Sequence, residues 1–168
     1  SFPFSVGQIP IYHAMLNTGR PDPGTQSKFR SNYLDIPNTP ALPFGFGLSY
    51  TTFSYSNLKI SSDKMLKTSK ITVTVDVKNT GDRAGDEIVQ MYIRDVVASI
   101  SRPMKELKGF EKIHLKQGES KTVSFTIDDS LLKFYNSDLE LIAEPGVFEV
   151  MIGQNSKDVQ KVSFVLEK

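Results

Sequence analysis

The chain has 168 residues, enough for one ordinary domain or for one domain with an additional arm. Hydrophobic residues make up 39% and charged residues 23%, which is the composition of a globular protein rather than a disordered one. Twenty basic residues against nineteen acidic ones leave a net charge of +1, so the chain offers no strong field for nucleic acid or an anionic membrane. No apolar stretch approaches the roughly 18 residues of a membrane span. We therefore expect neither a nucleic-acid partner nor a membrane span.

The residue types present in the chain argue against several classes of catalytic and metal-binding site. Cysteine is absent, which excludes disulfides, thiolate metal sites and cysteine nucleophiles. The two histidines, His13 and His114, stand in separate regions without a ligand spacing, so we expect no metal site. A serine-nucleophile elbow and a phosphate-binding loop with its lysine are both missing, and we expect no cofactor. Acidic residues such as Asp76 and Glu149 fall on the polar faces of predicted strands, which favours solvated structural carboxylates over a catalytic pair.

The first 47 residues form an arm that is rich in proline and aromatic residues. They hold seven of the nine prolines, whose fixed φ and missing N–H disfavour regular helices and central strands. Ten of the seventeen Phe and Tyr residues fall within residues 1–55, and an irregular segment with so many large apolar rings is expected to lie against a surface. That surface is either the chain's own strands or a neighbouring domain. Four aromatic residues are expected to pack on the strands that follow the arm: Phe44, Phe46, Tyr50 and Phe53.

From residue 53 onward the hydrophobic pattern has a period of two. Val73, Val75 and Val77 alternate with polar residues, which is typical of a half-buried antiparallel strand. Seven strands are predicted, over residues 53–61, 70–79, 87–95, 105–115, 120–127, 139–142 continued by 146–153, and 159–167. This pattern predicts an all-β fold. We expect an immunoglobulin- or fibronectin type III-like two-sheet antiparallel β-sandwich that follows the irregular N-terminal arm.

Three segments depart from simple alternation. Residues 87–95 carry apolar side chains on both faces, so this strand is expected to be central or covered. Residues 61–70 are polar and rich in lysine, which indicates a solvated loop. One helical turn is expected over residues 131–135, capped by one of the acidic or hydroxyl residues at 128–130.

Composition and periodicity do not name a function, but several long stretches resemble the carboxy-terminal region of glycoside hydrolase family 3, the β-glucosidase family. The most specific are PFGFGLSYT at residues 43–51 and RPMKELKGFEK at residues 102–112. The resemblance continues, in order along the chain, through SVGQIPIYH (5–13), NTGRP (17–21), NYLDIP (32–37), NTGDRAGDEIVQMYIRD (79–95) and EPGVFEVMIG (144–153).

This resemblance implies a domain organisation. Members of the family have a catalytic (β/α)₈ barrel, then an α/β sandwich domain, then a fibronectin type III-like domain. Residues 1–47 are therefore expected to be the end of the α/β sandwich domain, and residues 48–168 the fibronectin type III-like domain. The family's nucleophilic aspartate and its acid/base glutamate belong to earlier parts of the polypeptide and match no segment here, so no catalytic residue is assigned.

The resemblance also implies a function. The chain is expected to be a non-catalytic, stabilising carboxy-terminal module of an enzyme that hydrolyses β-linked glucosides with retention. Its partners would be the barrel and the α/β domain, and a carbohydrate substrate would be reached only through the whole enzyme. A periplasmic or secreted bacterial enzyme is favoured by the same resemblance.

Three arm residues are candidate site residues: Arg20, Tyr33 and Asp35. They either pack and form ion pairs at a domain interface, which we favour, or border the mouth of the parent enzyme's active site. An alternative function for the chain is an autonomous carbohydrate-binding or adhesion module. Such a module needs exposed, coplanar aromatic rings, whereas tryptophan is absent and most strand aromatics fall on inward positions. A complete small hydrolase ranks last.

Overall fold

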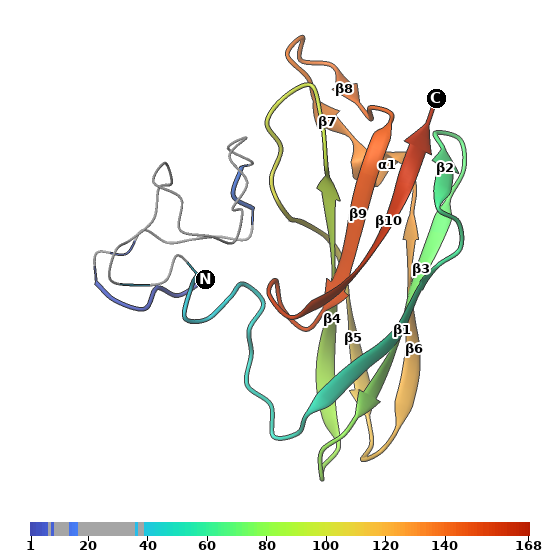
Figure 1. Ribbon diagram of the computed structural model, residues 1–168. Coiled ribbons are helices and arrows are strands. Elements are labelled where there is room, and N and C mark those ends of the chain that lie inside the picture. The colour runs from blue at the N-terminus through green and yellow to red at the C-terminus, as the bar shows by residue number, and fades with distance from the viewer. Residues whose placement is uncertain (7, 9–13, 17–35, 37–38) are drawn as a thin grey trace.

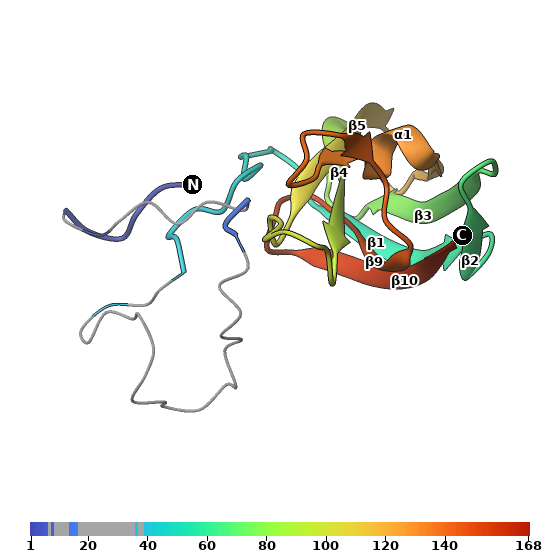
Figure 2. The same cartoon turned by 90° about the horizontal axis from the view of Figure 1, so that it is seen from above.

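The computed structural model describes residues 1–6, 8, 14–16, 36 and 39–168. Within these residues the chain is almost entirely β-structure, with one helical turn (Figure 1). The elements in chain order are β1 (Phe53–Ile60), β2 (Lys64–Leu66), β3 (Ile71–Asn79), β4 (Gly85–Asp95), β5 (Glu106–Leu115), β6 (Ser120–Ile127), α1 (Asp129–Leu132), β7 (Phe134–Tyr135), β8 (Leu141–Ile142), β9 (Gly146–Gly153) and β10 (Val159–Glu167). Six of the seven predicted strands are present within two residues of their expected ends, and the all-β sandwich prediction is confirmed. The strand predicted over 139–142 and 146–153 is instead two strands in different sheets, β8 paired with β7 and β9 in the larger layer. Seen from above, the described parts of the arm stand to one side of the strands (Figure 2).

One layer of the sandwich is a three-stranded antiparallel sheet in the order β1-β3-β6. Its alternating sequence sets its two faces, because successive side chains of a strand point to opposite sides. Val75 of β3 pairs with Val123 of β6, and both are buried. The neighbouring pair, Thr74 and Ser124, lies on the outward side.

The other layer is a five-stranded sheet in the order β2-β10-β9-β4-β5. The strand predicted from residues 87–95 to be central or covered is β4, which lies between β9 and β5. The apolar faces of the two layers enclose one core. Its largest fully buried side chains include Phe148 and Phe164, whose rings stack with centroids 5.5 Å apart. Gly109 of β5 lies against the Phe125 ring from the opposite sheet.

Two further sequence predictions need correction. The segment 61–70 is not simply a solvated loop, because Lys64–Leu66 forms β2, which pairs in parallel with β10 and buries Met65 in the core. The helical turn occupies Asp129–Leu132 rather than residues 131–135, with Asp128 as its N-cap. Phe134–Tyr135 instead forms β7, which pairs with β8. No helix in the described part of the chain has the length and hydropathy needed to cross a membrane.

Candidate functional site

The outward face of the five-stranded sheet is covered near the middle of β4. Alternation directs Val89 and Met91 toward the core and Gln90 and Tyr92 outward, yet all four side chains are buried. A buried polar side chain is stable only when it is hydrogen bonded. The cover must therefore supply partners, and part of it is residues 43–52, called the strap from here on.

Gln90 is the polar centre of this covered patch. Its Nε2 donates to the carbonyl of Gly45 at 3.3 Å and to that of Gln154 at 2.7 Å, and its Oε1 accepts from the Tyr92 hydroxyl at 2.5 Å. Burial raises the pKa of Tyr92 to about 12, so the hydroxyl keeps its proton at neutral pH. Gly45 has a φ of 81°, and a Cβ there would collide with the Gln90 amide, so only glycine fits where the strap crosses β4.

A second anchor of the strap lies at Ser156, in the loop between β9 and β10. The Ser156 N–H donates to the carbonyl of Phe44 at 2.9 Å, and the Ser156 carbonyl accepts from Lys105 Nζ at 2.5 Å. Burial lowers the pKa of Lys105. This anchor joins the PFGFGLSYT and RPMKELKGFEK motifs through one residue.

The far end of the strap is held by Asn79, which is completely buried at the end of β3. Its Oδ1 accepts from the Thr51 hydroxyl at 2.6 Å, while its Nδ2 donates to the carbonyls of Arg83 at 2.7 Å and Leu115 at 3.1 Å. A Cβ on Gly81 would collide with the Thr51 hydroxyl. The NTGDRAG turn therefore packs directly against the strap at Thr51 and Thr52.

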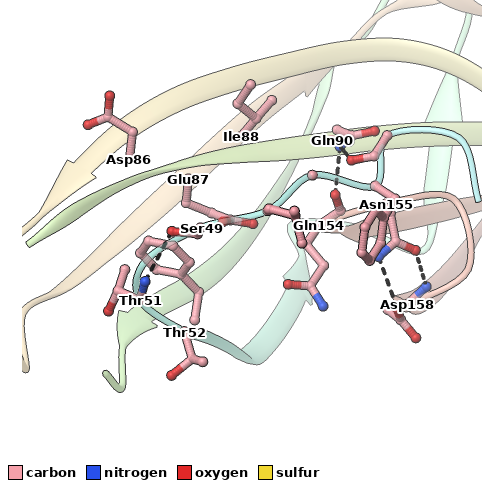
Figure 3. Close-up of a pocket in the computed structure, with 15 residues that line it drawn as sticks. Ser49, Thr51, Thr52, Asp86, Glu87, Ile88, Gln90, Gln154, Asn155 and Asp158 are labelled. Carbon is pink, nitrogen blue, oxygen red and sulfur yellow. Dashed lines mark hydrogen bonds between the residues drawn. The ribbon is translucent and has the colours of Figure 1, made fainter. Parts of the chain in front are cut away.

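A groove of about 380 Å³ runs between the strap and the sheet. Figure 3 shows Thr51 and Thr52 on the strap and Glu87 and Gln90 on β4 among its lining residues. Glu87 accepts a hydrogen bond from the Tyr55 hydroxyl at 2.7 Å. Burial raises the pKa of both groups, and the Glu87 carboxylate raises that of the Tyr55 hydroxyl further.

Several polar groups of this groove are hydrogen bonded within the protein. Asn155 accepts from the N–H groups of Lys157 and Asp158, each at 2.9 Å, and donates to the Asp158 carboxylate at 2.9 Å (Figure 3). Across residues 39–168 and the shorter described stretches before them, no three His, Asp or Glu residues gather where a metal ion could be held. The hydrogen bonds in the groove therefore join segments of the polypeptide to one another.

Another stretch of the arm reaches the five-stranded sheet at the start of the RPMKELKGFEK motif. Leu16 forms an isolated antiparallel bridge with Pro103, and the Met104 N–H donates to the Met15 carbonyl at 2.7 Å. Residues 14–16 and the strap, far apart in sequence, thus both bind this side of the sandwich.

Arg102, which precedes this contact, is nearly buried. It donates to the Glu106 carboxylate, and its guanidinium lies 4.2 Å from the centre of the Phe134 ring. Burial acts to raise the pKa of Glu106, but Lys108 and Arg102 outweigh burial and lower it.

Asp95, the last residue of β4, faces the same region. Burial raises its pKa to about 6, against the opposing effect of the Arg102 charge. Its Oδ2 has no hydrogen-bond partner among the described residues. An incompletely bonded buried carboxylate costs stability, which matters for the pH dependence considered below.

The predicted site residues Arg20, Tyr33 and Asp35 lie outside the described residues, so their roles stay predictions. Of the aromatic residues expected on the strands, Phe53 packs against the core and Phe44 is half-buried. The expectation was wrong for Tyr50, which is 95% exposed, and for Phe46, which is 44% exposed. The strap is fixed by its backbone and by Thr51, while the Tyr50 ring is exposed and Phe46 lines the groove between the strap and the sheet.

Sequence reasoning did not identify Gln90, Asn79 or Lys105 as anchors. One signal was available for Gln90, because it stands between Ile88 and Tyr92 on the outward face of a strand expected to be covered. A polar residue on a covered face implies a hydrogen-bonding partner, although the pattern does not tell which segment supplies it.

The comparisons with known proteins agree with this arrangement. The fibronectin type III-like domain family matches residues 87–156, from β4 to the Ser156 anchor. A periplasmic β-glucosidase of Salmonella typhimurium is 55% identical over 99% of the chain, and a putative β-xylosidase of Formosa agariphila is 47% identical over the same share. The chain spans only 22% and 21% of the length of these relatives.

Solved structures give the same result. A β-glucosidase from Listeria innocua in complex with glucose matches 100% of the chain with 44% identity and a TM-score of 0.88. A mutant of that enzyme in complex with laminaribiose matches with 45% identity and a TM-score of 0.90. The matched part is 24% and 23% of those chains, so the fold described here is one part of larger polypeptides.

Proposed function

This chain belongs to glycoside hydrolase family 3, as the carboxy-terminal region with the fibronectin type III-like domain, and from this premise we propose that it is a non-catalytic module that stabilises the rest of a β-glucosidase. The whole enzyme would hydrolyse β-linked glucosides with retention, using carboxylates outside these 168 residues. Residues 1–47 would be the end of the α/β sandwich domain, and residues 48–168 the β-sandwich. The barrel and the α/β domain would be its partners.

The observation that carries this proposal is the covered outward face of the five-stranded sheet. Gln90, Tyr92 and Ser156 are all buried there: Gln90 and Ser156 donate to the strap, and the Tyr92 hydroxyl donates to Gln90. A face built in this way binds polypeptide. A catalytic site would instead leave polar groups available to substrate.

The test uses the Salmonella typhimurium relative. Its matching region is replaced by residues 1–168 in one enzyme and deleted in another. We expect the replaced enzyme to hydrolyse an aryl β-glucoside and to resist heat, because 55% identity preserves most contacts between the region and the remainder. We expect the deleted enzyme to lose activity on mild heating.

Two results would overturn the proposal. One is equal heat resistance of the deleted and replaced enzymes. The other is hydrolysis by the purified 168-residue chain that disappears when one of its own acidic residues is mutated. Tight binding of β-glucan by the isolated chain, measured by calorimetry, would favour the carbohydrate-binding alternative.

A further inference from the structure

A group of exposed apolar side chains lies beyond the arm contact, on the loop between β4 and β5 and on the β7–β8 hairpin. Its members, called the apolar ridge from here on, are Val97, Ile100, Tyr135, Leu139 and Leu141, which are 77%, 37%, 61%, 80% and 52% exposed. Apolar residues scattered singly on a surface need no explanation, but these five lie on two segments that contact each other where Arg102 packs on the Phe134 ring, and such a grouping marks an interaction site. Figure 1 shows the hairpin above this loop, at the end of the sandwich where β4 stops.

The hairpin holds its apolar tip in a conformation that leucine rarely adopts. Leu139 has a φ of 61°, in the left-handed region that favours glycine or asparagine. The Asn136 side chain fixes this turn, because its Oδ1 accepts from the N–H groups of Asp138 at 3.0 Å and Glu140 at 2.9 Å. The Leu139 side chain is 80% exposed, so the strain at this turn is not offset by burial within this chain, which points to a role in contact.

The loop is held by two hydrogen bonds to the segment around β9. The Val96 N–H donates to the Val147 carbonyl at 3.1 Å, and the Ser99 N–H donates to the Glu144 carboxylate at 2.9 Å. These hydrogen bonds therefore order the backbone that carries the exposed side chains of Val97 and Ile100. A surface ordered in advance loses little entropy when a partner binds.

The ridge is continuous with the contact made by the arm. Arg102 lies against the Phe134 ring of the hairpin, and the next residue, Pro103, forms the bridge with Leu16. The relatives carry more than three-quarters of their length outside the matched region, so such enzymes contain a large further polypeptide for the ridge to contact.

From this continuity we propose that the apolar ridge docks on an apolar surface of the remaining part of the same β-glucosidase polypeptide. This inference rests on the proposed function and names the surface through which the module acts. The three-stranded sheet, on the opposite side of the core, presents a polar outward face and is not part of the docking surface.

The experiment compares ridge variants with a matched control in the replaced Salmonella enzyme described above. The ridge variant carries Leu139→Gly and Leu141→Ser. The control carries Leu66→Ser on β2, where the leucine is 48% exposed, close to the 52% of Leu141. We expect the ridge variant to raise the rate of thermal inactivation about tenfold, the factor that corresponds to 1.4 kcal/mol. The control should leave this rate unchanged.

The isolated 168-residue chain separates docking from folding. Glycine adopts a φ of 61° without strain, so Leu139→Gly alone should leave the Tm of the isolated chain unchanged or raise it. The same substitution should destabilise the replaced enzyme. A Tm that falls equally in both would assign Leu139 to the fold and overturn the inference.

The outcomes distinguish this inference from the function on which it rests. If the unaltered replaced enzyme is no more heat-resistant than the deleted one, both fail. If it is stabilised but the ridge variant behaves like the Leu66→Ser control, only the ridge fails. Sedimentation of the isolated chain as a dimer that Leu139→Gly dissociates would show a second copy as the occupant, and would also overturn the inference.

Discussion

The outward faces of the two sheets differ in the partners to which their polar side chains are hydrogen bonded. On the three-stranded sheet the outward side chains are polar and bond to one another, as where Asp76 accepts from the Thr122 hydroxyl at 2.6 Å and from Asn57 Nδ2 at 2.9 Å. On the five-stranded sheet the outward Gln90 and Tyr92 are buried, and the Gln90 amide donates to the strap. One face is completed by its own strands, and the other is completed by a segment from outside the sheet.

This difference indicates which side of the module binds other polypeptide segments. Exposed polar side chains can form their remaining hydrogen bonds with water. Buried polar side chains on a covered face need partners from a specific covering segment. The strap crosses β4 of the five-stranded sheet, residues 14–16 contact the loop between its strands β4 and β5, and Val97 and Ile100 of the apolar ridge lie on the same loop. We therefore assign partner binding to that side, and the predictions below test the assignment.

The largest effect is expected within the three-stranded sheet, where burial alternates residue by residue. Val75→Asp places an unpaired charge in the core and should lower the free energy of unfolding by about 3–5 kcal/mol. Thr74→Asp, on the outward face, should cost less than about 1 kcal/mol. Chemical denaturation measures both, and equal losses would show that the facing of β3 is misassigned.

A direct comparison of the two outward faces comes next. Gln90→Ala removes the amide that donates to the carbonyls of Gly45 and Gln154 and should cost about 1–3 kcal/mol. Ser124→Ala, at an exposed outward position of β6, should change stability by no more than about 0.5 kcal/mol. If urea denaturation gives the same small value for both, the five-stranded face is not completed by the strap.

A smaller effect concerns pH. The folded-state pKa of Asp95 is raised to about 6, so the folded chain binds this proton more tightly than the unfolded chain does. The contribution of Asp95 to stability is therefore most favourable at low pH and is lost as pH rises from about 4 to about 6. Asp95→Asn should remove this loss, so its stability relative to the unaltered chain should increase by about 1–2 kcal/mol between pH 4 and pH 7.5. Urea denaturation at the two pH values measures it, and a relative stability that decreases over this range would contradict the burial of Asp95.

The smallest difference, about 1 kcal/mol between two glycine variants, separates strap docking from backbone strain. Gly45 and Gly118 both have positive φ, but only Gly45 has a neighbour where a Cβ would be placed. Gly118→Ala should cost about 1 kcal/mol for strain alone, and Gly45→Ala about 1 kcal/mol more. Hydrogen exchange of the Ser156 amide, which binds the strap at Phe44, should accelerate only in Gly45→Ala. Acceleration in both variants would mean that strain rather than the crossing with Gln90 sets the effect.

The strands were largely predictable because each has one buried face. Alternation alone located β3 and β6, and the double-sided pattern of β4 correctly indicated a covered strand. The strand β2 could not be found in this way, since three residues are too few for a period and its partner, β10, lies about a hundred residues away. Phe134–Tyr135 was assigned to a helical turn because its pairing with β8 depends on a hairpin rather than on local propensity.

The candidate site was less predictable than the fold. Aromatic residues of the strap were expected to pack, since burial favours large apolar rings, but Tyr50 is exposed while the backbone and Thr51 make the contacts. Backbone hydrogen bonds leave no trace in a hydrophobic pattern. Gly45 and Gly81 mark where the strap approaches, but glycine in a sequence indicates equally a turn or a close contact.

Hydrogen exchange, compared between the isolated 168-residue chain and the same residues within the replaced Salmonella enzyme, tests the central claim most directly. We predict slower exchange inside the enzyme for residues 97–101 and 136–140, and no change for the turn at residues 116–119, which lies away from the ridge. Equal exchange of residues 97–101 and 136–140 in the two contexts, or new protection only on the three-stranded side, would contradict docking through the five-stranded side of the module.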